Sequence, residues 1–111
     1  MSNRRPFVHE AELVLGEAAD TRAPGGAVTV ALCGHWDHEG PRRWPHTNAI
    51  VVEHGHARLR TVFVAPPGDE DVVRERIDRG LRAADEWTVV DARARPLTPE
   101  EKALARRLLF A

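Results

Sequence analysis

The sequence predicts an α+β fold, with a mostly antiparallel sheet of four or five strands and two helices in the order β-β-β-β-α-β-α. Three observations predict it. Short runs rich in β-branched residues alternate with turn signals, two segments repeat apolar residues at helical spacing, and the connections are short enough to favour antiparallel neighbours. The 111 residues suit one core, so we expect a single domain over 1–111 with a histidine-rich loop at 33–46.

The first four predicted elements are strands, over residues 7–15, 27–33, 47–53 and 57–65. The first alternates loosely between apolar and polar residues. The second, Ala-Val-Thr-Val-Ala-Leu-Cys, is apolar on both faces, as a central strand would be, and residues 20–26 before it suit a loop. His54-Gly55 predicts a tight hairpin turn, because glycine accepts a positive φ.

The second half of the chain predicts helix, strand and helix. Acidic residues at 69–71 suit a helix N-terminus, and apolar residues then recur at helical spacing at Val73, Ile77, Leu81 and Ala84. A fifth strand covers 87–92. Thr98-Pro99-Glu100-Glu101 predicts a C-terminal helix that begins with a capping box.

Composition limits the classes of function. The formal net charge is -1, from 16 Lys and Arg against 17 Asp and Glu, so no overall field favours nucleic acid or an anionic membrane. No apolar run approaches the roughly 20 residues of a membrane span, and the N-terminus lacks the apolar region of a secretory signal. One cysteine excludes an internal disulfide and suits a reducing compartment, so we expect a cytoplasmic protein.

The chemically distinctive segment runs from Cys33 to His46. It reads Cys-Gly-His-Trp-Asp-His-Glu and then, after a short Gly- and Pro-containing stretch, Trp-Pro-His. Its potential ligands are Cys33, His35, His38 and His46. Imidazole and thiolate suit Zn and Cu, and three histidines with one cysteine would complete a tetrahedral shell, so we predict a transition-metal site, with Zn as the expected ion.

Alternatives remain open at this stage. Asp37 and Glu39 are either further ligands or groups that orient the imidazoles. In the structural alternative, the histidines lie in a solvated loop and Cys33 is a small buried residue. In the functional alternatives, the chain is a non-catalytic interaction module or homodimer with a protein partner, or a small metal-dependent enzyme in which Trp36 and Trp44 line a pocket.

Cys33 to Gly40 resembles the H-x-H-x-D-H metal motif of the metallo-β-lactamase superfamily, with Cys33 in place of the first histidine. The resemblance covers eight residues and implies His35, Asp37 and His38 as metal ligands. Members of that family need about twice this length and further ligands on separate loops. The resemblance is therefore one of local chemistry, and no hydrolase activity is inferred from it.

Overall fold

The computed structural model describes residues 3–33 and 44–110. In these two ranges the chain forms four strands and three α-helices. They follow one another as β1 (Arg5–Leu15), α1 (Ala23–Cys33), β2 (His46–Glu53), β3 (His56–Ala65), the 3-10 turn η1 (Pro67–Asp69), α2 (Glu70–Arg82), β4 (Trp87–Arg95) and α3 (Pro99–Leu109). The α+β class is confirmed, with four strands and with three helices rather than two.

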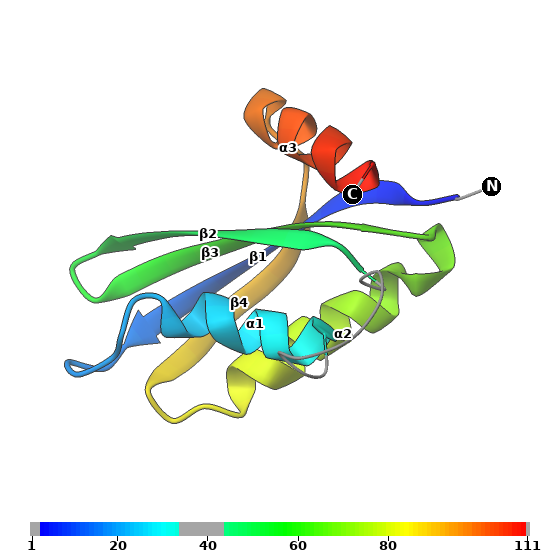
Figure 1. The fold of residues 1–111 in the computed structure, drawn as a ribbon. Coiled ribbons are helices and arrows are strands. Elements are labelled where there is room, and N and C mark those ends of the chain that lie inside the picture. Colours follow the sequence, from blue (N-terminus) through cyan, green and yellow to red (C-terminus); the bar gives the residue numbers. More distant parts are fainter. Residues whose placement is uncertain (1–2, 34–43, 111) are drawn as a thin grey trace.

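All strand pairs are antiparallel, and the order across the sheet is β2-β3-β1-β4. A β-α-β-β-α-β chain with this strand order has the ferredoxin-like, split β-α-β topology. The two crossovers place α1 and α2 on one face of the sheet, and α3 follows on the opposite face (Figure 1). The edges of the sheet are therefore β2 and β4.

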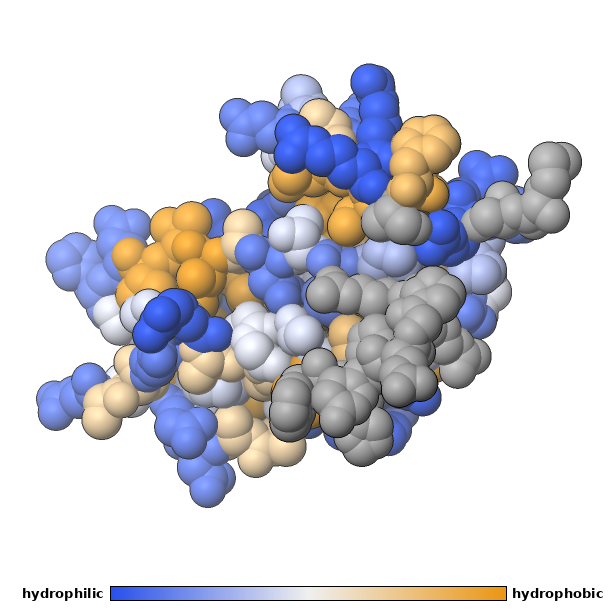
Figure 2. Space-filling model, viewed as in Figure 1, coloured by the Kyte–Doolittle hydropathy of each residue, from blue (hydrophilic) through white to orange (hydrophobic). Residues whose placement is uncertain are grey.

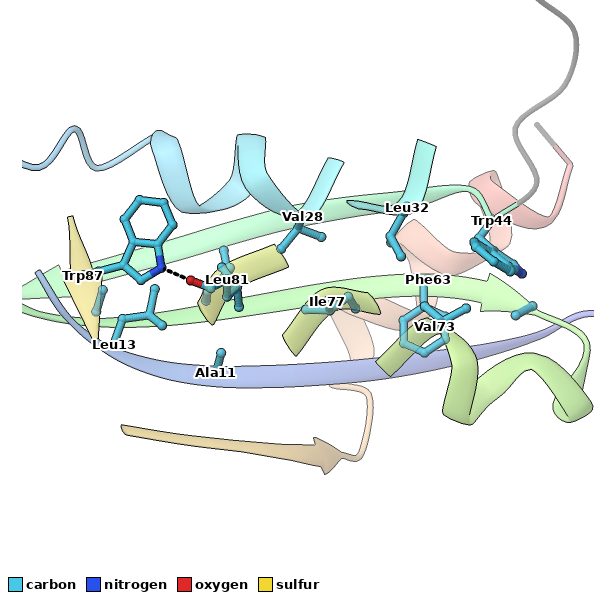
Figure 3. Close-up of a cluster of buried hydrophobic side chains, with 13 residues drawn as sticks. Ala11, Leu13, Val28, Leu32, Trp44, Phe63, Val73, Ile77, Leu81 and Trp87 are labelled. Carbon is cyan, nitrogen blue, oxygen red and sulfur yellow. Dashed lines mark hydrogen bonds between the residues drawn. The ribbon is translucent and has the colours of Figure 1, made fainter. Parts of the chain in front are cut away.

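The main core lies between the sheet and the α1–α2 layer. Phe63, Val28 and Ile77 are among its fully buried side chains, one each from β3, α1 and α2 (Figure 3). At one end of this core, Trp87 begins β4 and donates its indole N–H to the Leu81 carbonyl at 2.8 Å. A second, smaller apolar cluster lies between α3 and the other face of the sheet, and consists of Val8, Val62 and Ala105.

The strand predicted over 27–33 is wrong, because α1 occupies Ala23–Cys33. The loop predicted over 20–26 is confirmed for residues 20–22 and wrong from residue 23 onward. A short apolar run does not distinguish strand from helix by periodicity, and its β-branched residues favoured a strand. The buried residues Pro24, Val28 and Leu32 stand four apart and thus share one helical face. Packing of that face against the sheet and α2 outweighs local propensity.

The other predicted elements are confirmed. The predicted hairpin between β2 and β3 is confirmed, and it turns through His54 (φ 52°) and Gly55 (φ 79°). The positive φ of Gly55 was expected, whereas that of His54 was not. Val73, Ile77 and Leu81 form the buried stripe of α2. In α3 the Thr98 hydroxyl accepts from the Glu101 amide while the Glu101 carboxylate accepts from the Thr98 amide, which completes the predicted capping box.

Candidate functional site

Two of the four predicted metal ligands lie within the described residues. Cys33 is the last residue of α1 and is partly buried as a free thiol. His46 is the first residue of β2, and its exposed fraction is 6%. His35 and His38 lie outside the described residues, as do Trp36, Asp37 and Glu39. The structure therefore places the two ends of the predicted site.

Side-chain contacts hold α1 alongside β2. The Asn48 amide donates to the Gly25 carbonyl at 3.2 Å, and one helical turn later Thr29 Oγ1 lies 3.1 Å from His46 Nε2. The helix and the strand thus run in opposite directions. Cys33, one further turn along α1 from Thr29, lies on the same side of the helix and toward the start of β2. Both ends of the histidine-rich segment are therefore at one end of the molecule.

The predicted geometry of Cys33 needs correction. We expected Cys33 and His35 to share one face at a strand end, because residues two apart do so in a strand. Cys33 instead ends a helix, and His35 lies outside the described residues, so the alternation of a strand does not relate their side chains. The prediction that His46 stands at the entry to the next strand is confirmed.

Two hydrogen bonds orient the neutral His46 ring. Its Nδ1 lies 3.2 Å from the Trp44 carbonyl oxygen, which only accepts, so Nδ1 carries the proton. Nε2 then holds a lone pair and accepts from the Thr29 hydroxyl. Donation of one ring N–H to a backbone carbonyl is also the usual way in which proteins orient a metal-binding histidine.

Polar residues of three elements continue this arrangement into the core. The Thr61 hydroxyl donates to Asn48 Oδ1 at 2.7 Å, and Asn48 Nδ2 lies 3.4 Å from Thr29 Oγ1. With Thr29 as the donor to Nε2, the donors from Thr61 to His46 all point in the same direction. Thr29, Asn48 and Thr61 were not predicted from the sequence as members of the site. Asn48 and Thr61 are cross-strand partners on the helix-facing side of apolar strands. Two polar residues paired at that position could have indicated a buried polar contact.

Trp44 anchors the chain just before β2. Its exposed fraction is 2%, and its indole N–H donates to Asp69 Oδ2 at 3.1 Å. The Arg76 guanidinium lies 4.9 Å from the ring centroid, within the range of a cation–π contact. Figure 3 shows Trp44 at one end of the core and Trp87 at the other. Trp44 therefore fixes the position from which His46 enters the sheet.

The remaining histidines have other environments. His9 is buried between β1 and α2, where Nε2 lies 2.8 Å from Asp78 Oδ1 and Nδ1 lies 3.1 Å from an Arg74 nitrogen. His54 and His56 are exposed at the hairpin. Among residues 3–33 and 44–110, no three His, Cys, Asp or Glu side chains come together as metal ligands. No helix in that part of the chain is long and apolar enough to cross a bilayer.

A comparison with models of protein families finds no match, and a comparison with curated proteins finds no relative.

Proposed function

We propose that the protein binds a transition metal, with Zn the expected ion, through Cys33, His35, His38 and His46. The observation that supports this most directly is the packing of α1 against β2, which brings the Cys33 and His46 ends of the segment to the same end of the molecule. The Trp44 carbonyl also holds the His46 ring at Nδ1, so that a metal would bind at Nε2 in place of the Thr29 hydroxyl.

The residue types favour a structural role for the ion. Three imidazoles and one thiolate would fill a tetrahedral shell, whereas catalytic zinc keeps one position open for water. In a reducing compartment the single cysteine would stay reduced, and it would lose its proton on binding the ion. If one of the four does not bind, the open position would accept water, and Asp37 or Glu39 would be the base beside it. A metal-dependent enzyme is the alternative that follows.

Elemental analysis of untagged protein tests the proposal. We expect close to one Zn per chain, and we expect replacement of both His35 and His38 by Ala to remove it. The matched control replaces His54 and His56, two exposed histidines of the hairpin, and should keep the ion. Cobalt substitution followed by visible spectroscopy then distinguishes a four-ligand shell from one with bound water.

Two outcomes would contradict metal binding. The first is protein that carries no metal after purification and takes up none on titration with Zn²⁺. The second is an equal loss of metal in the two double variants, since that would mean adventitious binding to surface imidazoles.

A further inference from the structure

The two edges of the sheet differ in charge. From Thr47 to Val52, β2 carries no charged residue, and Val51 is 69% exposed. The other edge strand, β4, carries Asp91, Arg93 and Arg95, and its pairing with β1 is interrupted by a register shift. Charges and irregularities are the usual means by which proteins prevent an edge strand from pairing with another chain. β4 has this protection, and β2 lacks it.

The backbone of β2 offers hydrogen-bonding groups along its outer side. The Val64 amide of β3 donates to the Pro45 carbonyl, and inward and outward residues alternate along an antiparallel strand. The N–H and C=O groups of Asn48, Ile50 and Val52 therefore point away from β3. Within the part of the chain that the structure describes, no backbone group pairs with these three residues on that side.

The helix beside this edge is also uncharged. α1 contains no charged residue, Val30 is 55% exposed, and a side chain at Gly26 would meet no atom within 4 Å. A helix that is apolar on all sides is expected to be buried. Between α1 and β2 lies a groove of about 410 Å³ lined in part by Gly25, Gly26 and Thr29. Figure 2 shows a hydrophobic patch on this side of the molecule, toward the β2–β3 hairpin.

We propose that β2 pairs with β2 of a second copy of this chain, in antiparallel orientation about a two-fold axis, so that two sheets become one of eight strands. A register centred on Ile50 places outward-facing backbone groups opposite each other. It sets Val51 opposite Ala49 of the other copy and Glu53 opposite Thr47, so no like charges face each other. Two uncharged β2 edges can pair without burying a charge or bringing like charges together. The formal net charge of -1 also gives two copies little mutual repulsion.

Sedimentation of the full chain between about 1 µM and 1 mM tests this pairing. We expect the wild-type mass to rise from 12.4 kDa to twice that value. Val51→Lys should raise the dissociation constant at least about tenfold, because it puts a charge at the centre of the interface. Val90→Lys is the matched control. Val90 is 60% exposed on the other edge strand, lines the same pocket on the sheet face as Val51, and should leave the dimer unchanged.

Amide hydrogen exchange provides a second measurement that needs no variant. The amides of Asn48, Ile50 and Val52 should exchange more slowly at high protein concentration than at low concentration. A wild-type mass of one chain at every concentration would overturn the proposal, as would equal effects of the two lysine variants. Dissociation by a chelator would also overturn it and would indicate a metal-mediated contact instead, whereas metal content in Val51→Lys reports separately on the proposed metal site.

Discussion

At the scale of single residues, Arg60 is a charge held by two carboxylates on the α3 side of the sheet. Its guanidinium donates to both Glu101 oxygens, at 2.7 and 2.8 Å, and to Glu10. Glu10 is 4% exposed as a side chain and Glu101 12%. Hydrogen bonds from Arg60 hold the pKa of the Glu101 carboxyl below its usual range, and the two carboxylates hold the pKa of Arg60 above its own.

Arg60→Met is expected to lower the free energy of unfolding by about 2 kcal/mol, because it leaves Glu10 and Glu101 largely buried without their common donor. Urea denaturation measures the change. Arg79→Met removes an ion pair with Glu75 whose side chains are 75% and 67% exposed, and it should cost at most about 0.5 kcal/mol. Equal losses in the two variants would mean that burial of the Arg60 cluster adds no stability.

The lowered pKa of Glu101 also predicts a pH dependence. Because the folded state favours the ionised carboxylate, Glu101 stabilises the protein above the pKa of the unfolded chain. That contribution is lost as the pH falls through the folded-state pKa. Glu101→Gln should therefore be clearly less stable than wild type at neutral pH and approach it in acid. Thermal melts across the acid range measure this convergence, and a constant difference would contradict the assignment.

At the scale of elements, the contact between α1 and α2 depends on one glycine. A Cβ on Gly80 would lie 2.8 Å from Ala31 Cβ and 3.3 Å from the Ala27 carbonyl oxygen. The helices thus approach through small residues, and the lower helix propensity of glycine in α2 is offset by this close packing.

Gly80→Ala should destabilise the protein by about 1–2 kcal/mol, although alanine is the better helix former, because α1 must move to accommodate the methyl group. Gly26→Ala in α1 meets open space and is expected to stabilise by about 0.5 kcal/mol. Differential scanning calorimetry of the two variants and the wild type measures these changes in stability. Pairing Gly80→Ala with Ala31→Gly should restore part of the loss, and stabilisation by Gly80→Ala alone would contradict the clash.

These contacts also show what the sequence could predict. Period-2 and period-3.6 patterns, turn glycines and the Thr98 capping box are local signals, and they located the four strands and the helices α2 and α3. Residues 27–33 have no such signal for a helix, because the decisive contacts come from α2 and β2, which are distant in sequence. For the same reason, Cys33 and His46 could be predicted as metal ligands from their residue type alone. The contact between Thr29 and His46 could not be predicted, because it depends on how α1 packs against β2.

At the scale of the whole molecule, the two faces of the sheet are covered unequally. The α1–α2 layer contributes to a large apolar core, whereas the cluster at α3 contains three buried residues, and Arg60 adds the main polar contact. We infer that α3 separates from the sheet in a partial opening at a lower free energy than global unfolding.

Native-state hydrogen exchange tests this opening. Amides in the middle of α3 should exchange at least about tenfold faster than those of Ile77 and Leu81 in α2. Arg60→Met should accelerate the α3 amides more than those of α2. Uniform protection of both helices would show that the two layers unfold together.

The composition of α1 has a consequence for the protein when it is heated or partly unfolded. Residues 27–33 combine β-branched side chains with the absence of charge and of proline, which is the composition of segments that stack into amyloid fibrils. Their helical state depends on the contact with α2. Gly80→Ala, which weakens that contact, should shorten the lag before thioflavin-positive fibrils form, and Val30→Lys should lengthen it. The packing of α1 therefore also protects the protein against aggregation.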